Sequence, residues 1–367
     1  MVDDRRRRLD ALRNCERILS GYPPATMRGR LAELEAGADL DRDPDFYGDG
    51  PVAELEEKVA GLLGKEAAVF FPTGTMAQQV ALRYGAGVTG RTAVALHRLG
   101  HQELHERQAH TQLTGLRSVW PTTAPRNPTA AEIARLEEPV GSVVIELPLR
   151  DAGFVLPTWD ELTAVAEAAR AKGARVHFDG ARLWESTTFL EHSLSEIAGL
   201  ADSVYVSFYK TVRGLSGAAL VGDAELAAYA RAWRHRYGGN VFQQWPAALT
   251  ALAGLERELP RLPGFVRHAR TVAEGLARVK GARVFPEPPH THQFRLFLPY
   301  RAEVLNRAAL VLAEDERVWF AGGWVEDEVP GMAMAEIMVA EHALEWTAEQ
   351  VAEVGARFAH LAQSMST

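Results

Sequence analysis

The chain has 367 residues, which is long enough for two domains with a substantial core. Its 47% of hydrophobic and 24% of charged residues are typical of a globular protein, and its net charge of −8 gives no reason to expect nucleic acid or an anionic membrane as a partner. The single cysteine, Cys15, excludes an internal disulfide and a cluster of thiolate metal ligands.

The sequence shows no apolar segment of the kind that directs a protein to a membrane or anchors it there. The N-terminus lacks the apolar core of a signal peptide, and no uninterrupted apolar stretch approaches the ~20 residues of a membrane span. We therefore expect a cytoplasmic protein.

Residues 1–45 are expected to form helices joined by a proline-containing loop. Beyond them, short apolar runs alternate with longer helical patterns, which is typical of a mostly parallel sheet. Strands are expected at residues 68–71, 93–96, 118–120, 143–147, 175–178, 203–208 and 218–221. Helices are expected at residues 75–84, 158–172 and 223–235.

The last third of the chain has a different pattern, with Pro/Gly breaks at residues 260–264, the strand-like runs RVFPE and FRLFLP, and a final helix from Thr347. Together these patterns predict an N-terminal helical segment (1–45), a large α/β domain with a mostly parallel sheet (46–255) and a smaller C-terminal α/β domain (256–367).

Two of the expected strands end in a reactive side chain. Asp179 ends the strand in RVHFDGARLWES, and Lys210 follows the strand in SVYVSFYKTVRGLSGAALVG. The carboxyl ends of strands in an α/β sheet are where such groups meet. A lysine amine can form a Schiff base with the aldehyde of pyridoxal phosphate (PLP), and a carboxylate can keep the pyridine nitrogen protonated. A surface lysine and a helix-capping aspartate are the plain alternatives.

Five segments decide between these interpretations. They are YGDGP (47–51), FPTGTMAQQ (71–79), HFDGAR (177–182), SFYKTVRGLSGAALVG (207–222) and RAWRHRYGGN (231–240). In this order they resemble the threonine aldolases, within the β-eliminating lyase group, over roughly residue 27 to the C-terminus. The resemblance implies the fold-type-I α/β fold of PLP-dependent enzymes, PLP as the cofactor, Lys210 as its covalent attachment point and Asp179 as the partner of its ring nitrogen.

The resemblance implies further cofactor contacts. Gly74 and Thr75 lie where a strand gives way to a helix, and the exposed N–H groups there suit a phosphate. Ser207 could add a hydroxyl contact, and His101 falls where the family has a histidine stacked on the cofactor ring. A metal shared by His97, His101 and His105 is the alternative that their spacing of four raises, but Gly100 predicts a helix that begins only near His101, so we expect no metal.

Substrate contacts are also implied. Arg182 would bind the α-carboxylate of an amino acid, since its planar guanidinium suits a two-point contact. Tyr47 would approach the site of a neighbouring subunit, because enzymes of this type usually build each site at a dimer interface, so we expect a homodimer or homotetramer. Ser20, in ILSGYPP, is a stand-in for a serine near the family's N-terminus.

The sequence departs from the family where the substrate is handled. The motif LENTH, whose histidine touches the substrate β-hydroxyl, is replaced by IELPL at 145–149. Val339 and Phe242 stand where the family has arginines. Arg213 stands where the family has glycine, and we hypothesise that it supplies an anion contact, to substrate or phosphate, that is lost elsewhere.

We therefore expect a PLP-dependent lyase that cleaves the Cα–Cβ bond of a β-hydroxy-α-amino acid to glycine and an aldehyde, with His101 or an ordered water as the base. One alternative is another PLP reaction on an amino acid, such as β-elimination or transamination. The other is a PLP-binding paralogue without turnover, which the missing substrate contacts would favour.

Overall fold

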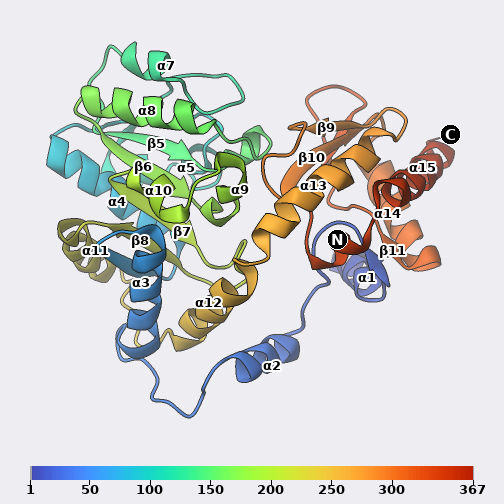
Figure 1. Cartoon of the computed structure of the whole chain (residues 1–367), viewed down its shortest axis with the longest axis horizontal. Helices are drawn as coiled ribbons and strands as arrows, with labels where there is room; N and C mark the ends of the chain where they lie inside the picture. Colours follow the sequence, from blue (N-terminus) through green and yellow to red (C-terminus); the bar gives the residue numbers. More distant parts are fainter. Residues whose placement is uncertain (1, 367) are drawn as a thin grey trace. The chain divides into compact units, whose positions relative to one another are not determined.

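The computed structural model describes residues 2–366, which divide into two compact units (Figure 1). The large unit comprises residues 31–261, and the small unit comprises residues 1–30 together with 262–367. The boundaries therefore differ from those expected at 46 and 256. The first 30 residues belong with the C-terminal part because β1 (Arg17–Ile18) pairs in parallel with β11 (Val318–Trp319).

The large unit is built on one seven-stranded sheet in the order β2-β8-β7-β6-β5-β3-β4. All its strands are parallel except β8, which runs antiparallel to both neighbours. The strands are β2 (Ala67–Phe71), β3 (Ala93–Ala95), β4 (Arg117–Val119), β5 (Ser142–Glu146), β6 (Arg175–Gly180), β7 (Ser203–Ser207) and β8 (Ala218–Gly222). All seven expected strands are thus confirmed, with ends that differ by one or two residues.

Helices cover this sheet, as the alternating pattern predicted (Figure 1). They are α3 (Gly50–Leu63), α4 (Gly74–Thr89), α5 (His101–Leu104), α6 (Ala109–Thr114), α7 (Ala130–Ala134), α8 (Trp159–Ala171), α9 (Thr187–Leu190), α10 (Leu194–Gly199), α11 (Ala224–Arg236) and α12 (Trp245–Glu258), with short 3-10 turns η1 (Arg150–Ala152) and η2 (Leu183–Glu185). The unit boundary falls within α2 (Met27–Gly37). Val80, Leu220 and Leu226 are among the fully buried side chains where α4 and α11 pack on the sheet.

The small unit has an antiparallel four-stranded sheet in the order β12-β13-β10-β9. Its strands are β9 (Arg283–Phe285), β10 (Gln293–Leu298), β12 (Val325–Glu326) and β13 (Ala333–Met338), and its helices are α1 (Val2–Arg13), α13 (Leu262–Ala277), α14 (Ala302–Glu316) and α15 (Ala348–Met365), with the turn η3 (Glu341–Glu345). Alternate residues of β13 are buried, and Phe294, Leu305 and Phe358 join them in one core. No helix within residues 2–366 is long and apolar enough to cross a membrane.

Candidate active site

Two carboxylates lie side by side at the carboxyl ends of β5 and β6. Glu146 and Asp179 are register partners of these parallel strands, and both are more than nine-tenths buried. Asp179 accepts hydrogen bonds from the Gln102 side chain at 2.9 Å and from the Ala181 N–H at 3.2 Å. These two contacts hold the carboxylate in one orientation.

Glu146 binds both the loop that follows β3 and the loop that follows β5. Its carboxylate oxygens accept from the N–H of His101 at 2.9 Å and from the N–H of Arg150 at 3.2 Å. Burial and the charge of Asp179 raise the pKa of Glu146 to about 7, although the two N–H donors act in the opposite direction. A proton on Glu146 therefore reduces the negative charge beside Asp179 near neutral pH.

Lys210 lies three residues beyond β7, in the same electrostatic environment. Burial and the Arg182 cation lower the pKa of Lys210 to about 8, while Asp179 and Glu146 act to raise it. A lowered pKa gives a larger neutral fraction, and only the neutral amine can attack an aldehyde. The sequence therefore folds so that a lysine, an arginine and two carboxylates influence one another at the strand ends.

This pKa predicts how the apoprotein should take up PLP. The rate of covalent attachment should rise about tenfold per pH unit below pH ~8 and level off above it, since the neutral amine is the reactive form. Arg182→Ala should move this midpoint to higher pH, whereas Arg236→Ala, at an exposed position of α11, should leave it in place. Stopped-flow absorbance across a pH series measures both, and a midpoint unmoved by Arg182→Ala would contradict the assignment.

The start of α4 forms a cradle suited to a phosphate. Gly74 and Thr75 line a cavity of about 310 Å³ together with His101, Tyr205 and Tyr209. Thr73 caps the helix by accepting from the N–H of Met76, while the first-turn N–H groups of a helix have no acceptor within it. A Cβ on residue 74 would overlap the Tyr205 hydroxyl, so glycine is required there. The cavity, the helix N-terminus and the nearby lysine–aspartate pair fit PLP.

His101 lies at the start of α5 and lines the same cavity. Its Nδ1 is 3.3 Å from Oε1 of the buried Glu106, whose other oxygen accepts from Gln79. Burial lowers the pKa of His101, but the hydrogen bond to Glu106 and the charge of Asp179 outweigh burial, so the net shift is upward. Glu106 therefore favours a proton on Nδ1 and leaves Nε2 as the acceptor.

The three histidines considered for a metal do not converge. α5 begins at His101 after the Gly100 N-cap, as predicted, and His97 lies before it with Nε2 2.8 Å from the Ala124 carbonyl. His105 follows α5, and its Nε2 lies 2.8 Å from a carboxylate oxygen of Asp151. Among the residues that the structure describes, no group of three potential ligands could hold a metal.

Arg182 offers a positive charge to an anion. Its Nε is buried without a hydrogen-bond partner, and its guanidinium lies over the Phe154 ring at 5.4 Å from the ring centroid. Phe154 lies in the same loop as Arg150, and its N–H donates to the Arg150 carbonyl at 3.2 Å. A buried guanidinium nitrogen without a hydrogen-bond partner is the feature expected of a carboxylate-binding residue.

The other predicted contacts lie elsewhere or have other partners. The Ser207 hydroxyl donates to the Ala181 carbonyl at 2.8 Å. Arg213, at φ 58°, pairs with the buried Glu258 at 3.6 Å and does not line the cavity, so an anion contact stays a prediction. Tyr47 is half-exposed and packs edge-on against Phe242. Ser20 belongs to the small unit, where its hydroxyl accepts from the N–H of Met338 at 3.0 Å.

Sequence reasoning missed several residues that shape the site, namely Gln102, Glu106, Glu146, Arg150 and Tyr205. Glu146 carries a usable signal, because it ends an expected buried strand just as Asp179 does. Gln102 and Glu106 carry no signal in the sequence, since they reach the site only through contacts between the loop after β3 and the end of β6.

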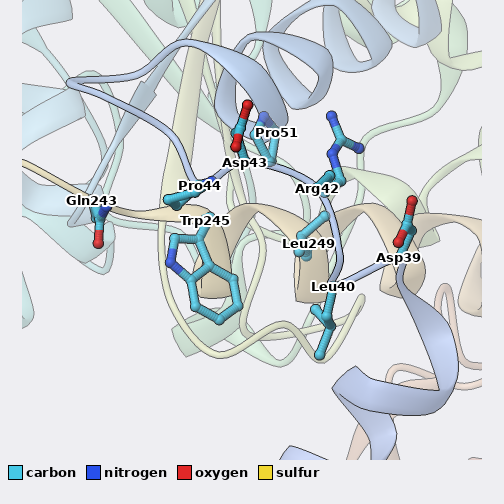
Figure 2. Close-up of a pocket in the computed structure, with 9 residues that line it drawn as sticks. All are labelled: Asp39, Leu40, Arg42, Asp43, Pro44, Pro51, Gln243, Trp245 and Leu249. Carbon is cyan, nitrogen blue, oxygen red and sulfur yellow. The ribbon is translucent and has the colours of Figure 1, made fainter.

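A second pocket of the large unit contains none of the predicted site residues. It has a volume of about 210 Å³ and lies where Trp245 and Leu249 of α12 face Leu40, Pro44 and Pro51 (Figure 2). Its lining also includes Asp39, Asp43 and Arg42, and Arg42 pairs with the carboxylate of Glu54.

Comparison with known proteins agrees with this geometry. The family model for β-eliminating lyases matches residues 21–297. The low-specificity L-threonine aldolase 1 of Arabidopsis thaliana is 30% identical over 69% of this chain and 74% of its own, and the corresponding enzyme of Escherichia coli (strain K12) is 30% identical over 70% and 78%. The crystal structure of a proposed L-allo-threonine aldolase from Listeria monocytogenes EGD-E superposes with a TM-score of 0.89 at 33% identity, covering 97% of this chain and 98% of that one.

Proposed function

Because the chain belongs to the β-eliminating lyase family, we propose that it cleaves the Cα–Cβ bond of a β-hydroxy-α-amino acid to glycine and an aldehyde. The resemblance read from the motifs is confirmed, and so are the fold class, PLP as the cofactor and a PLP-dependent lyase as the class of enzyme. The observation that carries the proposal is the group formed by Lys210, Asp179 and Arg182 beside the cradle at Gly74.

The bound cofactor supplies an electron sink for the pair left on Cα when the Cα–Cβ bond breaks. Lys210 Nζ would hold the cofactor through its aldehyde carbon. Asp179, whose orientation is fixed by Gln102, would keep a proton on the ring nitrogen. Arg182 binds the α-carboxylate, which orients the scissile bond.

The remaining step is removal of the β-hydroxyl proton, which we assign to Nε2 of His101. Glu106 holds the imidazole through Nδ1, so Nε2 can accept the proton and the Nδ1–H stays on the carboxylate side. The family histidine in LENTH has no counterpart here, since Leu149 is fully buried and apolar. His101 is thus the basic side chain of the cavity lining.

We also propose a homodimer or homotetramer with active sites at the dimer interface. The proposal is supported by a cluster of three exposed aromatic rings on the large unit, those of Phe46, Tyr47 and Phe242. The rings pack edge-on, with centroids 5.0–5.4 Å apart. Light scattering on the holoenzyme gives the oligomeric state. The cytoplasmic location stays a prediction.

The function is tested by incubating the PLP-loaded protein with threonine, allo-threonine and bulkier or aromatic β-hydroxy amino acids, and assaying glycine and aldehyde together. We expect equal amounts of both from at least one member of the panel. Pyruvate or another keto acid with ammonia would assign β-elimination instead, amino-group exchange with a keto acid would assign transamination, and no product from any member would favour the paralogue without turnover.

A further inference from the structure

Tyr205 occupies a position in the cavity that none of the steps above uses. It lies on β7, five residues before Lys210, and is only 4% exposed. Its hydroxyl lies against Gly74 at the first turn of α4, so closely that residue 74 has no room for a side chain. A buried polar atom is thus directed at the same helix terminus whose N–H groups suit a phosphate.

The Tyr205 hydroxyl is also held as a proton donor. Burial, with the charge of Asp179 next, raises the pKa of Tyr205 well above its ordinary value, so the phenol stays neutral. Burial raises the pKa of Tyr209, a residue that lines the same cavity, and Tyr205 acts to lower it, which is the effect of a Tyr205 hydroxyl that donates toward the Tyr209 oxygen. The charged phosphate group is a stronger acceptor than the neutral Tyr209 hydroxyl, so a phosphate in the cavity would take the Tyr205 proton in place of Tyr209.

The cavity needs such a donor because it contains little positive charge. Among the described residues that line it, His101 alone can be cationic, and no lysine or arginine is present. A phosphate dianion there must be stabilised mainly by N–H and O–H groups. We propose that the Tyr205 hydroxyl donates a hydrogen bond to the phosphate group of PLP. This inference rests on cofactor binding and is independent of which reaction follows.

The test is reversible binding of two ligands to Lys210→Ala protein, in which no covalent bond masks the affinity. PLP and pyridoxal, which lacks the phosphate, are titrated by fluorescence with and without Tyr205→Phe. Loss of one hydrogen bond to a charged group should raise the Kd of PLP about 10- to 100-fold. The Kd of pyridoxal should not change, since the ring contacts are intact.

A matched control is Tyr84→Phe in the same background. Tyr84 is also a mostly buried tyrosine, on α4 itself, but it packs against Tyr229 and does not line the cavity. It should leave both Kd values unchanged. Equal weakening of PLP and pyridoxal by Tyr205→Phe would assign Tyr205 to the ring or to packing and overturn the proposal, as would an unchanged Kd for PLP.

If Tyr205→Phe does not fold by circular dichroism, Tyr209→Phe replaces it. The Tyr209 side chain is 44% exposed, so its hydroxyl can be removed with little risk to the core. Because the Tyr209 hydroxyl competes with the phosphate as acceptor for the Tyr205 proton, we expect its removal to cause a small, PLP-selective fall in Kd of about threefold. An unchanged Kd would overturn the proposal. Glycine release by the wild-type enzyme is a separate result, so failure of this inference leaves the proposed reaction standing.

Discussion

Lys210→Ala is expected to abolish turnover, with kcat reduced by more than about 10³-fold, and to leave PLP bound only reversibly. The reason is specific to this lysine: burial and Arg182 lower its pKa to about 8, so a neutral amine is available close to physiological pH. A surface lysine has neither property.

The measurement is mass spectrometry after borohydride reduction of the holoenzyme, together with its absorption spectrum. Wild-type protein should carry PLP on the peptide that contains Lys210, and the variant should lose both this adduct and the absorption of the bound cofactor. Lys58→Ala, at an exposed position of α3, is the control and should behave as wild type. A reduced adduct on another lysine would contradict the assignment of Lys210 as the attachment point of PLP.

The sequence predicted the central part of this site because its signals are local. Each strand of the large unit is a short apolar run, and Asp179 directly follows such a run, so its place at the sheet edge could be inferred before the strand order was known. The cradle at Gly74 was predictable for the same reason, since a strand, a turn and a helix cap are adjacent in the chain.

The residues that orient these groups depend on contacts that no local pattern contains. Gln102 reaches Asp179 across 77 residues of sequence, and Glu146 meets the N–H of His101 because β5 lies next to β3. Tyr205 looked like an ordinary strand residue, and its significance arises from its approach to Gly74. The ion pair of Arg213 with Glu258 is a further contact between distant parts of the sequence, and the anion contact of Arg213 stays a prediction.

Asp179→Asn should separate the electrostatic role of Asp179 from a structural one. The amide keeps nearly the same shape and an oxygen that can accept a hydrogen bond, but it removes the negative charge. We expect kcat to fall about 10²- to 10³-fold, because nothing else positioned at the end of β6 would hold a proton on the ring nitrogen. If Asp179 were only the acceptor for the Ala181 N–H, activity would stay close to wild type.

Asp179→Asn should also change the pH midpoint of PLP attachment, and the direction of that change is a further test. Asp179 raises the pKa of Lys210, so its neutralisation should move the midpoint of PLP attachment below pH ~8, opposite to the shift expected for Arg182→Ala. The matched control is Asp202→Asn, since Asp202 accepts from the Val176 N–H at 2.6 Å near the opposite end of the same strand. That change should cost about 1 kcal/mol of unfolding free energy and leave the midpoint in place. Shifts in the same direction for Asp179→Asn and Arg182→Ala would mean that general loosening of the site, rather than charge, sets the reactivity of Lys210.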